Sequence, residues 1–377
     1  MMMYYKVLKS LSKIYLMAIF AALDIMAFAA RPIDTLRRSD MEFLTSPEAS
    51  RIGEQVLAYQ RITGGWPKNI DMCRPHTQEE IEAVLDDRNR TDDSTTDNFA
   101  TTTQMTFLAN MFQATHDDRY RDAFISGIEY LLSGQYDNGG WPQFWPNPEG
   151  YQVHITFNDG AMVNTLILLR DVADRMYPYD GSLVDDAVLA RTREAFGKGI
   201  ECILATQIRI DGKPTVWCQQ HDRETYAPAP ARSYELPSFC SQESAQIVNL
   251  LMQLPDPDDR VKAAVHGAMK WFDANKLMGY RLERTGKPKT PEADARLVVD
   301  PNAGPLWGRF YDLENCEIFV CDRDGIPRKS LEEIGQERRT GYSWYNSYPA
   351  DLYSVYAEWA DRYDPTGKVD LDYISLR

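Results

Sequence analysis

The chain has 377 residues, of which 44% are hydrophobic and 26% are charged, a composition that predicts a packed globular core. Its formal net charge at pH 7 is −15, which excludes long-range attraction of nucleic acid or another polyanion by the protein as a whole. A polyanionic substrate would therefore need a local cationic cleft or a bridging metal ion.

The N-terminal end has the pattern of a signal peptide. Three lysines lie between residues 6 and 13, residues 14–28 are largely apolar, and residues 27–29 read Ala-Phe-Ala, a small-x-small cleavage pattern. A membrane anchor is the alternative, and it is disfavoured because Asp24 interrupts a run that is short for a bilayer span.

We therefore expect residues 1–29 to be a signal peptide and residues 30–377 to form one domain of an exported, monomeric protein. It would be periplasmic or secreted and would not bind a membrane. The six cysteines permit fifteen fully paired connectivities, and disulfides and free thiols both stay open.

The predicted secondary structure is mainly helical. Apolar residues recur at three-to-four-residue spacing in the segments 81–85, 104–113, 123–132, 162–173 and 245–254. Further along the chain, two extended segments are expected at 306–314 and 319–325, and two more helices at 331–338 and 353–362. The sequence predicts an all-α fold with a few short strands in long loops.

A repeat organises these helices. Residues 60–69 read QRITGGWPKN and residues 135–144 read QYDNGGWPQF, and a degenerate third copy begins at Gln207 and contains Trp217. Each copy closes one apolar helix, turns through small residues and leads into a second helix. Repeated helix pairs of this size stack into solenoids or close into toroids.

Two acidic pairs lie at equivalent points of the repeat, Asp97-Asn98 and Asn158-Asp159, each before the second helix. Helix capping alone explains such residues. Because the positions are equivalent, we also expect the side chains to gather at one end of the ring, where two carboxylates could bind a hard cation with oxygen ligands from substrate and water.

Arg232 lies in a proline-rich segment, residues 228–238, that restricts its conformational freedom. It is a candidate site residue for that reason. An ordinary ion pair with Glu235 or Glu243 is the alternative.

Three further cations could line an anion-binding cleft: Lys68, Arg309 and Arg323. Guanidinium groups bind carboxylates in a bidentate way. Each of these residues alone is equally compatible with a solvated surface charge.

Eight blocks of the sequence, in order, resemble family 10 polysaccharide lyases, which are pectate lyases. They cover roughly residues 60–345. The blocks are TGGWPKN (63–69), DNFATTTQ (97–104), NGGWPQFWP (138–146), ITFNDGAMVN (155–164), WCQQHD (217–222), PARSYELPS (230–238), GPLWGRFYDLE (304–314) and ERRTGYSWY (337–345).

The resemblance implies that residues 30–377 form a catalytic domain, an incomplete α/α toroid with a wide groove for α-1,4-polygalacturonate. Cleavage by β-elimination would give 4,5-unsaturated oligogalacturonides, with Ca²⁺ bound between protein and substrate carboxylates. The residues implied as catalytic are Asp97 and Asp159, both also near the calcium, and Arg232 as the base. The residues expected to bind substrate are Arg309, Arg323, Asn98 and Lys68.

Other readings stay open. Neutral guanidine is scarce below about pH 12, so a lysine or a bound hydroxide is an alternative base to Arg232. An inverting glycoside hydrolase could use Asp97 and Asp159 as acid and base. The Q-x3-G-x-W pattern also resembles the repeat of triterpene cyclases, and an exported polysaccharide-binding protein without catalysis is a further alternative.

Overall fold

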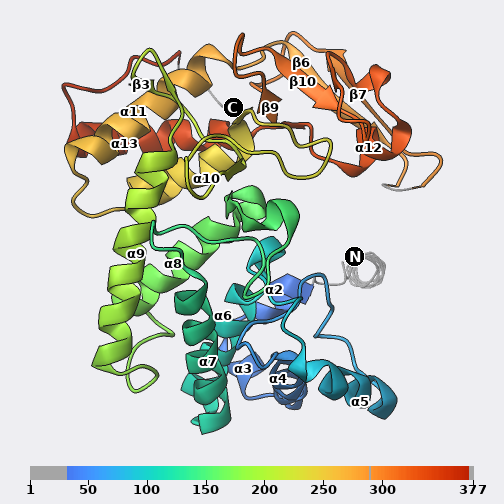
Figure 1. The fold of residues 1–377 in the computed structure, drawn as a ribbon, viewed down its shortest axis with the longest axis vertical. Coiled ribbons are helices and arrows are strands. Elements are labelled where there is room, and N and C mark those ends of the chain that lie inside the picture. Colours follow the sequence, from blue (N-terminus) through green and yellow to red (C-terminus); the bar gives the residue numbers. More distant parts are fainter. Residues whose placement is uncertain (1–31, 288–289, 373–377) are drawn as a thin grey trace, which may run out of the picture.

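The structure, a computed structural model, describes residues 32–287 and 290–372, and the predicted signal peptide, residues 1–29, lies outside this part of the chain. Figure 1 shows an arc of helix pairs that runs from α4 at the lower right, past α9 at the left, to α11 and α13 across the top. The prediction of an all-α array of repeated helix pairs is confirmed.

The long helices form two layers. One layer consists of α4 (Pro47–Tyr59), α7 (Asp118–Gly134), α9 (Asp186–Thr206) and α11 (Asp259–Ala274). The other consists of α6 (Thr102–Thr115), α8 (Ala161–Ala173), α10 (Ser241–Met252) and α13 (Leu352–Tyr363). Successive helices touch within each layer, and α6, α8 and α10 touch α7, α9 and α11 across the layers.

Burial along the sequence distinguishes an outer layer from an inner one. In α7 the buried residues Tyr120, Phe124 and Ile128 recur at four-residue spacing, as on a helix with one solvated face. In α6 every residue from 107 to 112 is buried, so this helix is covered on more than one side. The layer of α4, α7, α9 and α11 is therefore the outer one.

The repeated glutamines join successive outer helices. Gln60, Gln135 and Gln207 each cap the C-terminal end of an outer helix, and each Nε2 donates two hydrogen bonds. One bond goes to a carbonyl of the glutamine's own turn, and the other goes to a carbonyl of the next outer helix. The acceptors in the next helix are Ala123 in α7 (2.8 Å), Ala195 in α9 (2.8 Å) and Ala264 in α11 (2.9 Å).

The repeated glycines let the turns approach these helices. A Cβ on Gly64 would lie 2.2 Å from the carbonyl oxygen of Ser126, and one on Gly139 would lie 2.0 Å from that of Lys198. Both glycines also have positive φ, which other residues rarely adopt.

The repeated tryptophans anchor the turns, since each indole donates to a carbonyl in the last turn of the preceding outer helix at 2.7–2.8 Å. Trp307 makes this bond after α11, which reveals a fourth copy of the repeat. The donors are Trp66, Trp141, Trp217 and Trp307.

The strands are short and lie in the loops. The pairs are β1 (Ile155–Thr156) with β4 (Gln220–His221), β2 (Arg209–Ile210) with β3 (Lys213–Pro214), β8 (Trp307–Gly308) with β12 (Tyr345–Asn346), and β6 (Tyr280–Thr285) with β7 (Asp294–Val299). A four-stranded antiparallel sheet has the order β11 (Pro327–Arg328), β10 (Ile318–Cys321), β9 (Phe310–Tyr311), β5 (Phe239–Cys240).

Two local expectations need correction. The β6–β7 hairpin was not predicted. The predicted helix at 331–338 is instead a 3₁₀ turn, η5 (Leu331–Glu333), and a separate short helix, α12 (Gln336–Gly341). Ile334 between them is extended, with φ −110° and ψ 153°, and is buried at 3% exposure, so packing of this side chain interrupts the helix.

Three more short helices complete the N-terminal part: α2 (Pro32–Leu36), α3 (Met41–Leu44) and α5 (Gln78–Asp86). All six cysteines lie in the described part of the chain, and none of them forms a disulfide there. A search of the described residues finds no helix with the length and apolarity needed to cross a membrane.

The glutamine bridges generate a prediction about stability. Gln207 is 4% exposed, and Gln207→Leu leaves the carbonyls of Thr215 and Ala264 without its amide. We expect the free energy of unfolding to fall by about 1–3 kcal/mol, measured by chemical denaturation. Gln78→Leu, on the exposed surface, is the matched control. Equal unfolding midpoints for the two variants would contradict a stabilising role of the bridge.

Candidate active site

Two 3₁₀ turns carry the acidic pairs. η2 (Asp97–Phe99) precedes α6 and η4 (Asn158–Gly160) precedes α8, and the two turns contact each other. The chain bends through left-handed residues in both, Asn98 at φ 52° and Asp159 at φ 50°.

The capping interpretation of these residues is wrong. The N-cap positions of α6 and α8 are Thr101 and Gly160, and neither Asp97 nor Asp159 makes a capping hydrogen bond. The left-handed bends carry both carboxylates away from the helix starts and toward a common cavity.

That cavity has a volume of about 140 Å³. Five of the predicted site residues line it: Lys68, Asp97, Asn98, Asp159 and Arg232. Asn158, the neighbour of Asp159 in the second acidic pair, is also in the wall. The residues in the wall that the sequence analysis did not assign to a site are Asn69, Gln143, Tyr151, Gln220, Ala231 and Glu235. Two predicted residues, Arg309 and Arg323, are not part of the wall.

Asp97 is 1% exposed, and one of its oxygens is fully engaged. Lys68 Nζ and Gln143 Nε2 both donate to Oδ2, the latter at 2.9 Å. The other oxygen, Oδ1, is buried and accepts no hydrogen bond from a described residue. Because a buried carboxylate oxygen without a partner is costly, Oδ1 is suited to a ligand that the protein alone does not supply.

Asp159 lies across the cavity, partly exposed. Asn158 Nδ2 donates to its Oδ2 at 3.2 Å, and Arg309 Nη2 is 3.6 Å from its Oδ1. Burial raises the pKa of Asp159, the charges of Glu243 and Asp97 raise it further, and Arg309 opposes them. The negative charge of Asp97 therefore disfavours the ionised form of Asp159, and a cation between the two carboxylates would relieve this repulsion.

The donor set fits an incomplete calcium site. Asp97 and Asp159 offer hard oxygen ligands, the type that Ca²⁺ prefers. No group of three or more His, Cys, Asp or Glu side chains that could hold a metal ion occurs among the described residues. A bound cation would need further oxygens from substrate or water.

Arg309 lies behind Asp159, with 3% of its surface exposed. Its Nη2 donates to Glu243 and, at 2.9 Å, to Asn158 Oδ1. Burial alone would lower the pKa of Arg309, but the charge of Glu243 holds it well above its ordinary value. Through its hydrogen bond to Asn158, the buried Arg309 stabilises the η4 turn.

Arg232 is fixed by Glu235, as the ion-pair interpretation of this residue predicts. Its Nε donates to Glu235 Oε2 at 2.7 Å and its Nη2 donates to Oε1. Glu235 is 1% exposed and also accepts a hydrogen bond from Tyr342 Oη at 2.7 Å. Burial alone would lower the pKa of Arg232, but Glu235 outweighs it and raises that pKa above its ordinary value.

Arg323 is exposed and lies outside the cavity, where its guanidinium pairs with Glu337 and approaches the ring of Tyr234. Arg232 lies over the same ring. Asn98 is exposed at the cavity rim, and its Nδ2 donates to Asn69 Oδ1 at 3.4 Å.

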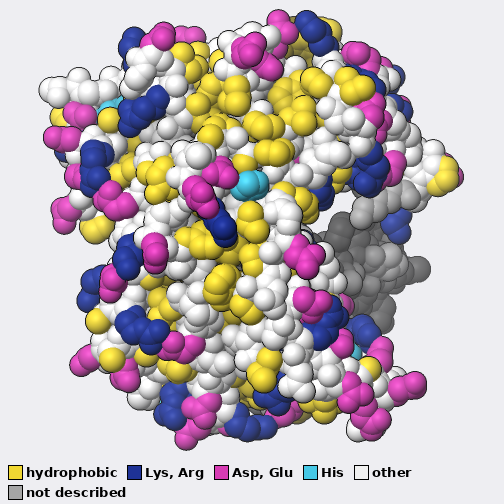
Figure 2. Space-filling model, viewed as in Figure 1, with side chains coloured by type: hydrophobic (Ala, Val, Ile, Leu, Met, Phe, Trp, Pro, Cys, Tyr) yellow, Lys and Arg dark blue, Asp and Glu magenta, His cyan; other side chains and the backbone are white. Residues whose placement is uncertain are grey.

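Figure 2 shows acidic and basic side chains interspersed over the face in view, so the charge on this face is not gathered in one patch.

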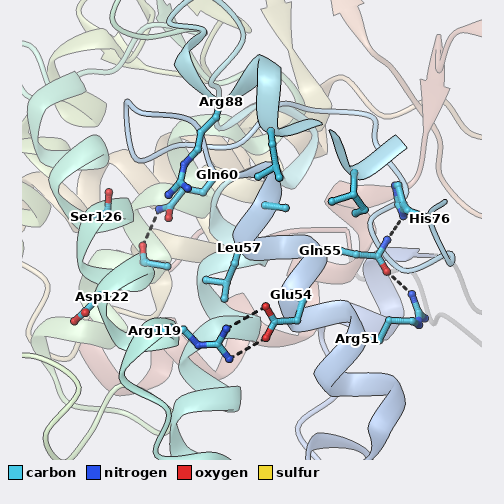
Figure 3. A pocket seen from close by; sticks show the side chains of 14 residues that line it. Arg51, Glu54, Gln55, Leu57, Gln60, His76, Arg88, Arg119, Asp122 and Ser126 are labelled. Atoms are coloured by element: carbon cyan, nitrogen blue, oxygen red, sulfur yellow. Dashed lines mark hydrogen bonds and ion pairs between the residues drawn. The ribbon is translucent and has the colours of Figure 1, made fainter. Parts of the chain in front are cut away.

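A larger hollow, of about 820 Å³, lies among α4, α5 and α7. Figure 3 shows Arg119 paired with Glu54 and Gln55 next to His76 in it. It shares no lining residue with the cavity at Asp97 and Asp159. The smaller cavity is the candidate active site, because it brings together the residues predicted from the repeat and contains the unpartnered Oδ1 of Asp97.

Some site residues could not be found from the sequence. Gln143 follows the second Gly-Gly-Trp-Pro block at the position of Lys68 in the first, and this equivalence was the available signal. Tyr342 lies more than 100 residues from Glu235, and no local pattern links the two.

Comparisons with known proteins agree with this geometry. A family model for pectic acid lyases matches residues 60–353, whereas a comparison with curated proteins gives no match. A family 10 polysaccharide lyase from Cellvibrio cellulosa has a similar structure, with a TM-score of 0.74 and 32% identity over 89% of this chain and 98% of that chain. A mutant of the Cellvibrio enzyme in complex with trigalacturonic acid matches with a TM-score of 0.74 and 32% identity, over 86% of this chain and 98% of that chain.

The family match spans most of the chain, and the structural match extends over almost the whole length of the Cellvibrio enzyme. The fold is accordingly the incomplete α/α toroid of family 10. The chain belongs to the pectic acid lyase family and is a polysaccharide lyase.

Proposed function

We propose that this lyase cleaves α-1,4-polygalacturonate by β-elimination with the assistance of calcium. One observation carries the proposal: two carboxylates, Asp97 and Asp159, and one guanidinium, Arg232, face the same small polar cavity, and one oxygen of Asp97 there has no partner. The complex of the similar Cellvibrio enzyme with trigalacturonic acid supports the substrate class.

The chemistry requires help from cations. Elimination removes the C5 proton of a galacturonate, breaks the bond from C4 to the glycosidic oxygen and leaves a C4–C5 double bond. The leaving oxygen takes up a proton from water and becomes the anomeric hydroxyl of the other fragment. The C5 proton lies next to a carboxylate, so the carbanion that forms adds negative charge to a group that is already charged. Bound by Asp97 and Asp159, Ca²⁺ would supply the charge neutralisation that this step needs.

The chain's own residues hold these groups in place. Lys68 and Gln143 fix one oxygen of Asp97 and leave the other free to bind. Asn158 orients the carboxylate of Asp159 by a hydrogen bond, and Arg309 orients it by an ion pair. Glu235 aims the guanidinium of Arg232 by two parallel hydrogen bonds, so little freedom is lost when substrate arrives.

Arg232 is our proposed base. To accept the C5 proton it must first lose one, and Glu235 opposes that loss by raising the pKa of Arg232. At pH values below the pKa of Arg232, its neutral fraction rises about tenfold for each unit by which the pH increases. The reaction should therefore accelerate toward alkaline pH.

We also propose that the protein is exported, periplasmic or secreted, and acts as a monomer. The signal-peptide pattern before residue 30 supports export.

The first prediction from the proposed function concerns the reaction itself. With purified protein and polygalacturonate, the ultraviolet absorbance of unsaturated uronide should rise in the presence of calcium. Addition of a chelator should stop this increase. A flat absorbance with growing numbers of reducing ends would instead indicate a hydrolase that uses Asp97 and Asp159, for which the raised pKa of Asp159 would suit the acid. No change in either signal would indicate a binding protein or a different polysaccharide.

The second prediction concerns Asp159. Asp159→Asn keeps the shape and removes one carboxylate from the proposed calcium site. We expect kcat/KM to fall by at least about tenfold and the calcium concentration for half-maximal activity to rise. Asp71→Asn, at an exposed position, is the control. An unchanged calcium dependence would show that Asp159 does not bind the ion.

The third prediction concerns Arg232. Arg232→Lys keeps a positive charge but loses the paired geometry with Glu235, and we expect kcat to fall by about 10²–10⁴-fold. Arg223→Lys, at an exposed position outside the cavity, is the control. Turnover near the wild-type value at every pH would count against Arg232 as the base.

The variant Glu235→Gln distinguishes two roles of Arg232, that of the base and that of a fixed cation that only stabilises charge. Glu235 raises the pKa of Arg232, so removing its charge should lower that pKa. If Arg232 is the base, the rising limb of the kcat profile should move to lower pH. If Arg232 only stabilises charge, the limb should stay in place while kcat falls.

A further inference from the structure

The carboxylate of Glu235 has two partners, Arg232, which lines the cavity, and Tyr342, which lies in the core. Arg232 donates three hydrogen bonds to it: the backbone N–H at 3.1 Å and Nε at 2.7 Å bind Oε2, and Nη2 binds Oε1. Tyr342 Oη donates to Oε1 at 2.7 Å. One oxygen of Glu235 is therefore shared between the proposed base and a buried phenol.

Tyr342 is held in place by aromatic packing. Its residue is 9% exposed, and its ring centroid lies 4.7 Å from that of Trp344 and 5.3 Å from that of Tyr234. A ring packed in this way has little room to follow a moving carboxylate. The hydroxyl therefore fixes Oε1 of Glu235, and Oε1 in turn fixes Nη2 of Arg232.

The same ring lies between the two arginines of the site. The guanidinium carbon of Arg309 is 4.6 Å from the ring centroid of Tyr342, and that of Arg232 is 5.7 Å from it. Tyr342 is not among the residues that line the cavity at Asp97 and Asp159. Its influence on the reaction would therefore pass through these neighbours.

A carboxylate with a second donor holds a cation less strongly. Burial would raise the pKa of Glu235, but hydrogen bonds and charge from Arg232 lower it, and the hydrogen bond from Tyr342 lowers it further. The phenol thus stabilises part of the negative charge that would otherwise act on the guanidinium alone. It weakens the pairing that opposes loss of a proton from Arg232.

This effect requires that Tyr342 keep its own proton in alkaline solution. Burial raises the pKa of Tyr342 well above its ordinary value, Arg309 opposes the rise, and the charges of Glu235 and Glu243 add to it. An ionised phenol would instead place a negative charge beside Arg232 and keep the guanidinium protonated.

Other titratable groups also act on Arg232, namely Asp159, Tyr151, Tyr234 and Arg338. Replacement of Tyr342 by phenylalanine retains all of them. It therefore isolates the contribution of the hydrogen bond that the phenol donates to Glu235.

We propose that Tyr342 is a positioning residue: through the carboxylate of Glu235 it orients the guanidinium of Arg232 and lowers the pH at which Arg232 can act as the base. This inference rests on the proposed function, because it takes Arg232 as the base of the elimination.

The test is Tyr342→Phe, which keeps the ring and removes the hydroxyl. We expect the rising limb of the kcat profile for polygalacturonate to move to higher pH by about 0.5–1 unit, a part of the shift that a full charge causes. At a pH on that limb, kcat should be about three- to tenfold lower, with KM unchanged. Tyr345→Phe, in the same hydrophobic cluster, is the control and should leave the limb in place.

A double-mutant cycle separates this role from a structural one. Glu235→Gln removes the charge that the hydroxyl stabilises, so adding Tyr342→Phe to Glu235→Gln should change kcat by less than about twofold. A loss of packing alone would lower kcat by the same factor with and without Glu235. That outcome, or a limb that does not move in Tyr342→Phe, would overturn the inference.

Ultraviolet titration tests the protonation of the phenol without substrate. Up to about pH 10, where an ordinary tyrosine is half ionised, tyrosinate absorbance should increase equally in the wild type and in Tyr342→Phe. A smaller increase in the variant would show that Tyr342 ionises in the working range and would overturn the inference. By contrast, turnover of Arg232→Lys near the wild-type value would overturn Arg232 as the base, and the inference with it.

Discussion

The side-chain amides of Gln60, Gln135 and Gln207 set the geometry on which the site depends. Each amide ties the end of one outer helix to a backbone carbonyl of the next. In the array that these bonds join, the segments that enter α6 and α8 meet, and Asp97 and Asp159 face one cavity although neither is near the other in sequence.

The site balances each buried or half-buried cation with a carboxylate of its own. Lys68 pairs with Asp97, Arg232 with Glu235, and Arg309 with Glu243. These pairs let charged groups reside in a poorly solvated region, where an isolated charge would be costly. Under the proposed function, a polyuronate would bring new carboxylates and a divalent ion would bring new positive charge. Binding would then exchange the partners of these charged groups while keeping them paired.

The repeat made the helix pairs predictable, because the repeated Gln, Gly-Gly and Trp mark the end of an outer helix and the turn after it. Such local signals can be recognised in a sequence. The equivalence of Asp97 and Asp159 followed from the same repeat. What could not be predicted depends on tertiary contacts: the left-handed bends that replace the expected caps, the burial of Arg309 against Glu243, and the break of the 331–338 helix at Ile334. The hairpin β6–β7 had no strong alternation to reveal it, since all but one of its strand residues are exposed or half-exposed.

Asp159 has a backbone conformation that glycine would adopt at lower cost. A non-glycine residue at φ 50° typically loses about 1–2 kcal/mol relative to right-handed conformations, and aspartate is among the few side chains that tolerate it. Its carboxylate is also held near like charges. The toroid therefore gives up folding stability at the very position that we propose as a calcium ligand, and selection for robustness and selection for catalysis would favour different residues there.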